Sequence, residues 1–163
     1  DRTGSNYSAV MYNGAPGTGT AFNGRFNPGF TDKIGALMGN VFLKVGGLEW
    51  FTTLESSKGR AKNQTIERKA SQFASDLVYR FGGTQNFWVG ARYNTVKAAL
   101  LDAASAPYDV KLDRTAFSAG WYVTKNIMAK AEYVTQNYND FLTTDIRNGG
   151  KFHGVVIEAV VGF

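Results

Sequence analysis

The sequence predicts an all-β fold of antiparallel strands, and three observations support this prediction. Apolar and polar residues alternate along six segments, and the connections between these segments alternate between short and long. The 163-residue chain is also rich in glycine and aromatic residues, and it has no cysteine. Successive side chains of a strand point to opposite sides, so strict alternation gives each strand one apolar face. This alternation of apolar and polar residues therefore predicts the fold class without reference to any motif.

Six segments have this period. The first, 41–55, is the least regular, with Leu48, Trp50 and Leu54 on one side. The other five alternate cleanly and are bounded by Gly, Asn and Thr clusters, as strands usually are. They are 72–81, 86–96, 112–123, 127–138 and 152–163. The sequence therefore predicts six or seven strands, the seventh coming from the N-terminal region.

Residues 1–40 have no clear periodicity and are predicted to form an irregular segment before the strands of 41–163. Within it, residues 7–12 favour one more strand, and 13–30 is a loop rich in Gly, Asn, Pro and Thr. Thr31–Gly39 begins with an N-cap residue, continues with an apolar stretch and ends with glycine. This combination favours a short helix.

The connections favour an up-and-down transmembrane β-barrel. Residues 82–85 and 124–126 form short turns, whereas 57–67, 97–110 and 139–150 are longer and polar. Outer-membrane barrels have short turns on one side and extended loops on the other. A soluble antiparallel barrel or sandwich also has period-two strands, so period two alone leaves that alternative open. Mean hydropathy is −0.24, and no apolar run approaches the ~18 residues of a membrane-spanning helix.

The two faces of the predicted strands differ in content. Four aromatic residues at the turn ends of the apolar faces are the candidates for an interfacial aromatic belt. They are Tyr79, Phe81, Phe87 and Trp121. Charged residues in the middle of strands fall on the opposite faces and are the candidates for a polar lumen. They are Arg80, Arg92, Arg114, Lys130 and Glu132.

Two interpretations of these charges stay open at this stage. Rings of arginine inside a channel select anions and bind phosphate through paired N–H donors. Alternatively, opposite charges neutralise one another across neighbouring strands, because an unpaired charge in a narrow lumen is costly. Five cations, Arg68 among them, face five carboxylates that include Glu49 and Glu55, which favours neutralisation.

The C-terminal segment resembles the C-terminal signature of bacterial outer-membrane barrels. Its aromatic last residue, Phe163, follows apolar residues at every second position, namely Ile157, Ala159 and Val161. In such barrels this signature is recognised by the barrel assembly machinery. The resemblance implies the same role for these four residues.

Residues from about 40 to 163 resemble the C-terminal half of phosphate-selective-porin-like outer-membrane proteins of Bacteroidetes-type bacteria. The matching stretches are Gly47–Phe51, Tyr79–Phe81, Gly90–Asn94 and Lys130–Val134. The resemblance implies a monomeric or trimeric diffusion channel, although the phosphate-binding ladder of that family has no residue-by-residue counterpart here. Since outer-membrane barrels have eight strands or more, the chain is expected to be the C-terminal part of a larger barrel.

The expected function is a porin-like channel for passive diffusion of small hydrophilic solutes or anions in the bacterial outer membrane. Its expected partners are the lipid bilayer, lipopolysaccharide, the barrel assembly machinery, and other outer-membrane proteins or a second copy. The alternative is a closed structural or partner-binding barrel, which bulky residues on the predicted lumen face favour. These residues are Phe51, Trp88, Met128, Val134 and Phe152.

Other function classes find little support. The net charge of +5 invites nucleic acid, but the aromatic residues lie opposite the mid-strand arginines, so no basic aromatic face forms. The single histidine, His153, favours neither a catalytic triad nor a metal cluster, and we expect no cofactor. The cationic stretch Ser57–Asn63 is predicted to be an outer loop. It either binds lipopolysaccharide phosphates and attracts anions, or is simply solvated.

Overall fold

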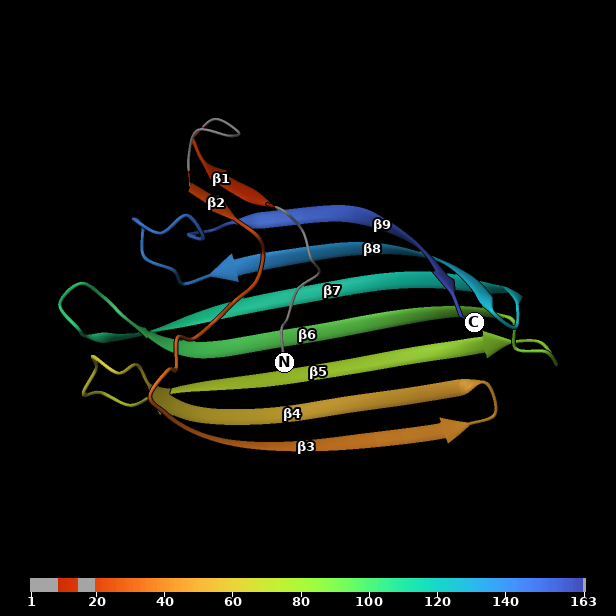
Figure 1. Cartoon of the computed structure of the whole chain (residues 1–163), viewed down its shortest axis with the longest axis horizontal. Coiled ribbons are helices and arrows are strands. Elements are labelled where there is room, and N and C mark those ends of the chain that lie inside the picture. Colours follow the sequence, from red (N-terminus) through yellow and green to blue (C-terminus); the bar gives the residue numbers. More distant parts are fainter. Residues whose placement is uncertain (1–8, 15–19, 163) are drawn as a thin grey trace.

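The computed structural model describes residues 9–14 and 20–162, which form a seven-stranded antiparallel sheet and a small hairpin. Each strand of the large sheet pairs with its neighbours in the chain, so the sheet is a simple meander (Figure 1). Its strands are β3 (Lys33–Val45), β4 (Leu48–Arg60), β5 (Arg68–Phe81), β6 (Phe87–Leu101), β7 (Pro107–Thr124), β8 (Ile127–Asn139) and β9 (Lys151–Val161). The hairpin joins β1 (Met11–Asn13) to β2 (Thr20–Phe22).

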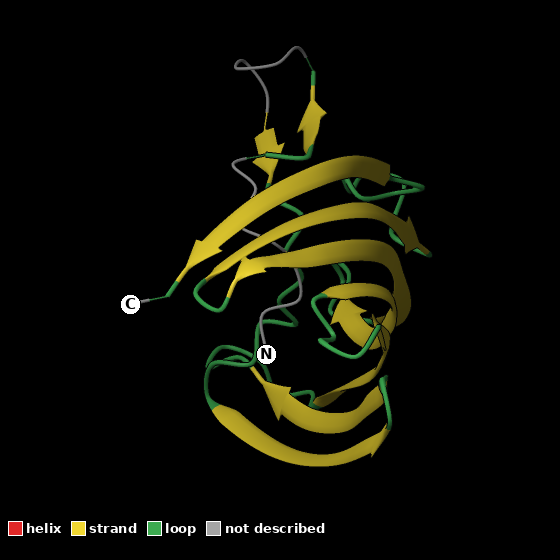
Figure 2. Ribbon diagram, turned by 90° about the vertical axis from the view of Figure 1, so that its right-hand side faces the viewer, coloured by secondary structure: helices red, strands yellow, loops and turns green. Residues whose placement is uncertain are grey.

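The predicted antiparallel all-β fold is confirmed, but the sheet is an open arc. Figure 2 shows the sheet curving so that residues 23–32, which precede β3, lie on its concave side, which we call the hollow. Among the described residues, β3 and β9 each pair on one side only, so they are the two edges of the sheet. A closed barrel is therefore not formed by this part of the chain.

The short helix predicted over 31–39 is wrong, because residues 33–39 belong to the first long strand. β3 pairs with β4 along its whole length, from Lys33 opposite Arg60 to Val45 opposite Leu48. This continuous ladder of hydrogen bonds outweighs the weak local helix signal. No helix, and hence none able to span a membrane, occurs in the described part of the chain.

The predicted strand over 41–55 is also wrong, because it contains a turn. Residues 46 and 47 connect β3 to β4, and Gly46 has a φ of 57°. Two-residue hairpin turns require such positive φ values, which glycine adopts without steric cost. The seventh long strand therefore comes from 33–45. The strand predicted over 7–12 corresponds only to β1, and its first two residues lie outside the described ones.

The two ends of the sheet carry different connections. Residues 46–47, 82–86 and 125–126 connect the strands at one end, and 61–67, 102–106 and 140–150 connect them at the other. The strands extend further into 57–67 and 97–110 than the polar sequence suggests. The predicted contrast in length is consequently smaller than expected, since 82–86 and 102–106 have equal lengths.

The sheet has a concave and a convex face. Directly opposite residues of paired strands point to the same side, so the pairing registers assign every side chain to a face. The concave face packs against Phe22, Phe26 and Phe30 from the N-terminal part of the chain. It does so only near the end of the sheet that carries connections 61–67, 102–106 and 140–150.

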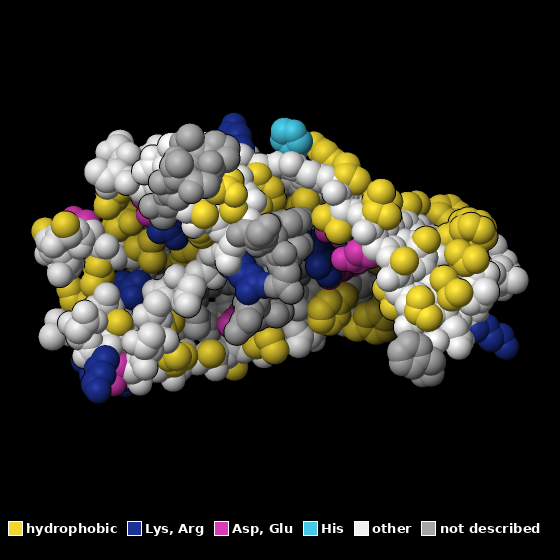
Figure 3. Space-filling model, turned by 45° about the horizontal axis from the view of Figure 1, so that its top comes forward, with side chains coloured by type: hydrophobic (Ala, Val, Ile, Leu, Met, Phe, Trp, Pro, Cys, Tyr) yellow, Lys and Arg dark blue, Asp and Glu magenta, His cyan; other side chains and the backbone are white. Residues whose placement is uncertain are grey.

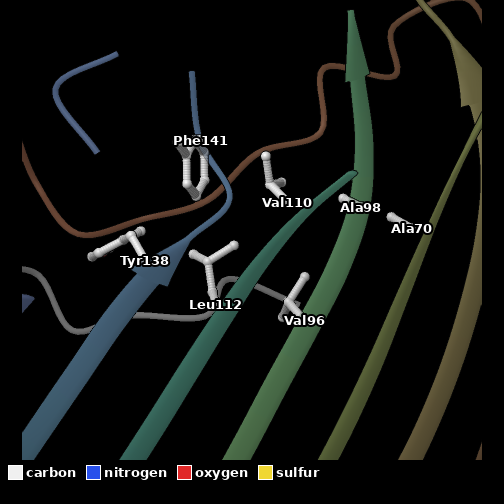
Figure 4. Close-up of a cluster of buried hydrophobic side chains, with 7 residues drawn as sticks. All are labelled: Ala70, Val96, Ala98, Val110, Leu112, Tyr138 and Phe141. Atoms are coloured by element: carbon white, nitrogen blue, oxygen red, sulfur yellow. The ribbon is translucent and has the colours of Figure 1, made fainter. Parts of the chain in front are cut away.

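A hydrophobic cluster fills the hollow at that end. Figure 4 shows its seven buried side chains. Six come from β5, β6, β7 and β8, and the seventh, Phe141, follows shortly after β8. They are Ala70, Val96, Ala98, Val110, Leu112, Tyr138 and Phe141. The segment 20–32 runs across them, so its aromatic rings are shielded from water. Burial of apolar surface stabilises the fold by about 25 cal/mol per Å². This burial attaches the segment to the concave face.

A polar network secures the same contact. The Tyr138 hydroxyl donates to the carbonyl oxygen of Gly24 at 3.0 Å, and Gln136 Nε2 donates to that carbonyl at 3.2 Å. Gln136 Nε2 also donates to the Tyr138 hydroxyl at 2.6 Å. Tyr138 is fully buried, so its hydroxyl and the Gly24 carbonyl would each lose a hydrogen-bond partner if the segment moved away.

Replacing Tyr138 with Phe is expected to destabilise the protein by about 1–2 kcal/mol. The change removes one buried donor to Gly24 and the acceptor of Gln136 while keeping the aromatic ring. The control is Tyr133→Phe, because Tyr133 lies on the convex face of the same strand and is half exposed. Urea unfolding of the two variants measures the difference. Equal stabilities would contradict a role for the network.

Candidate functional site

The five predicted lumen residues all lie on the concave face. Arg80, Arg92 and Arg114 come from β5, β6 and β7, and Lys130 and Glu132 come from β8. They occupy the half of the hollow nearer the short turns, beyond the hydrophobic cluster. Figure 3 shows side chains of both charge signs next to each other in the hollow. The structure thus brings these residues to one surface.

The first charged group joins three neighbouring strands. Arg80 Nε donates to Glu49 Oε1 at 3.0 Å, and Arg80 Nη2 donates to Glu49 Oε2 at 3.3 Å. Lys44 Nζ donates to the same Glu49 Oε1 at 2.8 Å. The Arg80 guanidinium also lies 5.9 Å from the ring centre of Tyr122. A bidentate arginine–carboxylate pair fixes both side chains in orientation as well as in charge.

The second group is a single pair between adjacent strands. Asp76 on β5 lies directly opposite Arg92 on β6, and both Nε and Nη2 of the guanidinium donate to the carboxylate. The Arg92 side chain is nevertheless 58 % exposed. Arg92 is therefore readily accessible to solvent, although it is paired with Asp76.

The third group connects β7, β8 and β9. Lys130 Nζ lies 2.9 Å from Glu132 Oε2 and 3.4 Å from Glu158 Oε2. Arg114 Nη2 lies 3.7 Å from Glu132 Oε1, and Arg114 Nη1 donates to Gln136 Oε1 at 3.4 Å. Each carboxylate thus lies beside at least one cation. The three groups follow the pattern in which opposite charges neutralise one another across strands.

Three further residues qualify the sequence-based picture. Lys44 belongs to the first group, and sequence reasoning missed it because the turn at 46–47 was not separated from its flanking strands. Arg68 forms no ion pair with a described residue; it donates to the Ala99 carbonyl and lies over the Phe30 ring at 5.2 Å. Arg68 is therefore part of the packed half of the hollow. Glu55 has no ion pair within the described ranges.

The convex face has the opposite composition. Across the middle of all seven strands, every residue on this face is uncharged. One exposed apolar or aromatic residue from each strand illustrates the band: Val41, Trp50, Leu77, Val89, Phe117, Tyr133 and Ile157. From Ser75 to Phe81 the band covers six residue steps, or about 20 Å along β5, and Asp113 on β7 marks its limit at the level of Phe73. This length is somewhat shorter than the ~25 Å apolar band of outer-membrane barrels.

The four candidates for an aromatic belt lie on this convex face beside the short turns. Tyr79 and Phe81 make an edge-to-face contact with ring centres 4.8 Å apart, and Phe87 stacks on Trp121 at 5.4 Å. All four side chains are about half exposed. Figure 3 shows hydrophobic side chains gathered over this end of the molecule.

The predicted assembly-signal residues are only partly described. Ile157, Ala159 and Val161 project from the convex face of β9, and Ile157 is 82 % exposed. Phe163 lies outside the described residues. His153 is on the same face, with its ring centre 6.4 Å from that of Tyr133. No group of His, Cys, Asp or Glu suited to a metal ion occurs among the residues that the structure places.

The predicted outer loop Ser57–Asn63 is corrected by the structure. Lys58 and Arg60 are in β4 and project from the convex face, and the loop itself is 61–67. Glu67 in this loop lies 2.8 Å from Lys33 Nζ and 2.5 Å from Lys58 Nζ. Hydrogen bonds from these two ammonium groups lower the pKa of the Glu67 carboxyl to about 2.

The lowered pKa of Glu67 predicts an acid-sensitive contact. The carboxylate stabilises the fold fully above its ordinary pKa of ~4.3, and this contribution is lost as the pH falls toward 2. The stability difference between the unmodified protein and Glu67→Gln should therefore shrink steadily between about pH 4.5 and pH 2. Urea unfolding at several pH values measures it. A difference that does not change with pH would contradict the ion pairs.

Comparison of the chain with protein-family models, with curated proteins and with solved structures finds no match. The charged concave face and the uncharged convex band are therefore the features from which a function has to be inferred.

Proposed function

We propose that this chain forms part of the wall of a β-barrel channel in the bacterial outer membrane, through which small hydrophilic solutes or anions diffuse. The convex face would contact lipid, and the concave face would line the lumen. The end with the short turns would face the periplasm, and the end with connections 61–67, 102–106 and 140–150 would face outward. The resemblance to phosphate-selective-porin-like proteins agrees with this arrangement.

One observation carries the proposal: the polarity of the sheet is inverted relative to a water-soluble sheet. A water-soluble sheet buries its apolar side and exposes its charges. Here the convex side exposes an uncharged band on all seven strands, while charged residues from all seven strands project into the hollow. Lipid would cover such a band, and water in a lumen would solvate the charges.

The ion pairs suggest what the lumen would select. Paired charges leave a nearly neutral surface, so the channel would discriminate mainly by width and only weakly by charge. Arg92 is the more accessible arginine, at 58 % exposure of its side chain against 13 % for Arg114. Any preference for anions would depend mostly on Arg92. The packed segment 20–32 would narrow the lumen near its outer end.

A closed barrel remains the second candidate, because the hydrophobic cluster occupies the outer half of the hollow. Seven buried side chains and the aromatic residues of 20–32 pack together in that half. If strands beyond this chain add similar packing, the lumen is blocked and the protein would act in structure or partner binding. Channel recordings separate the two candidates.

The test is the single-channel conductance of the full-length protein in planar bilayers. The proposal predicts discrete current steps that remain open over a wide voltage range. Absence of current from correctly inserted protein would overturn the channel and favour the closed barrel.

Neutralising Arg92 is expected to shift the selectivity toward cations. In Arg92→Gln the Asp76 carboxylate loses its partner, so the lumen becomes more negative at an accessible position. The reversal potential in a tenfold KCl gradient should move toward the value of a cation-selective pore. Lys125→Gln, an exposed change in the 125–126 turn, removes the same charge and serves as the control. Equal shifts in both variants would exclude Arg92 as a selectivity residue.

A further inference from the structure

A row of cations borders the apolar band on the convex face, at the end of the sheet opposite the aromatic residues. The pairing registers place Lys58 directly opposite Lys69 and Lys97 directly opposite Lys111. Together with the other cations at this level they form what we call the basic row. Its members are Lys33, Lys58, Arg60, Lys69, Lys97, Lys111 and Lys151.

The basic row is not neutralised by its surroundings. Opposite cross-strand residues have Cβ atoms only about 5 Å apart, so like charges in these positions repel each other. Neighbouring carboxylates pair with some members, for example Glu67 with Lys58 and Asp113 with Lys111 at 2.9 Å. Lys69, Lys97 and Lys151 form no ion pair with any described residue, and all three are exposed. An anionic ligand would relieve this repulsion.

A groove leads from the apolar band to the basic row. It has a volume of about 640 Å³ and crosses β3, β4, β5 and β6. Leu37, Leu54 and Phe73 line its apolar part, and Ser56, Ser71 and Lys97 line its polar part. Ser71 lies directly opposite both Ser56 and Lys97, so hydroxyl donors and an ammonium group meet at one point. Such a surface suits a molecule with an acyl chain and an anionic head.

We propose that this groove and the basic row bind a lipid whose headgroup carries more than one phosphate. The acyl chains would lie against the apolar part of the groove, and the phosphates would lie among Lys58, Lys69 and Lys97. Several phosphates are favoured over one because the row has members on six of the seven strands, all except β8. Its seven cations also outnumber the three carboxylates that pair with them, namely Asp32, Glu67 and Asp113. The inference rests on the proposed function in one respect, namely that the convex face contacts a membrane.

The opposite rim of the band argues that the recognition is specific to one leaflet. There the convex face ends in Tyr79, Phe81, Phe87 and Trp121, and its described strand residues include no cation. Aromatic rings suit any interface, whereas unpaired ammonium groups favour anionic headgroups. Diphosphorylated lipid A, which belongs to the outer leaflet, is therefore the probe of choice.

The test measures binding of diphosphorylated lipid A to the full-length protein in detergent, by native mass spectrometry. Lys69→Gln combined with Lys97→Gln is expected to weaken binding by roughly thirtyfold, at about 1 kcal/mol for each lysine. Lys44→Gln combined with Lys125→Gln removes the same charge from exposed positions at the opposite end of the sheet and is the control. It should retain binding within about twofold. Circular dichroism confirms that both double variants fold.

Other probes distinguish the source of the phosphate. Monophosphorylated lipid A is expected to bind more weakly than the diphosphorylated form, and phosphatidylcholine should show no dependence on the two lysines. Equal binding of the mono- and diphosphorylated forms would overturn the preference for several phosphates. Full competition by millimolar inorganic phosphate would show a free-anion site instead of a lipid site. Equally weakened lipid binding in the two double variants would show that only the net charge of the protein matters, and would reject the specific site.

This result can be separated from that of the conductance test. Lipid binding that depends on Lys69 and Lys97 in a protein without channel current would support the lipid site and reject the channel. Channel current without such lipid binding would support the channel and reject the lipid site.

Discussion

The register of strand pairing is the constraint on which the rest of the structure depends. Lys44 pairs with Glu49, Asp76 with Arg92, and Lys130 with Glu158, each directly across a strand boundary. Because side chains alternate between faces, a slip of one residue would move a whole strand's charges to the convex side. Register thus creates the ion pairs and keeps the convex band free of charge at once. Both faces are consequences of the same hydrogen-bonding pattern.

The sequence predicts the faces of the strands well but not all of their boundaries. Mid-strand residues such as Arg92 and Phe117 are assigned to the correct side because period two is a local property of the chain. Thr31–Gly39 is different, since Ile34, Leu37 and Met38 fit a helical spacing as well as a strand. Only its pairing with β4, which is a tertiary contact, decides between the two. The Gly46–Gly47 pair, which is typical of a two-residue turn, was the sequence feature that could have predicted the hairpin between β3 and β4.

The contacts of the N-terminal segment could not be predicted either. Phe30 lies over Arg68, and the carbonyl of Gly24 accepts hydrogen bonds from Tyr138 and Gln136, which are distant in sequence. Residues 20–32 have no periodicity from which the residues that they pack against could be predicted. Their placement divides the hollow into an apolar half and a charged half. In the charged half, lower exposure to water would strengthen each ion pair beyond its value on an open surface.

The meander of seven strands has a geometric consequence for the proposed barrel. Neighbouring strands reverse direction at each turn, so with an odd number of strands the two edges, β3 and β9, run the same way. Joining them directly would require a parallel pair, which an up-and-down arrangement does not provide. An entirely antiparallel closure would therefore require an odd number of additional strands, and the proposed barrel would have an even number of strands in total.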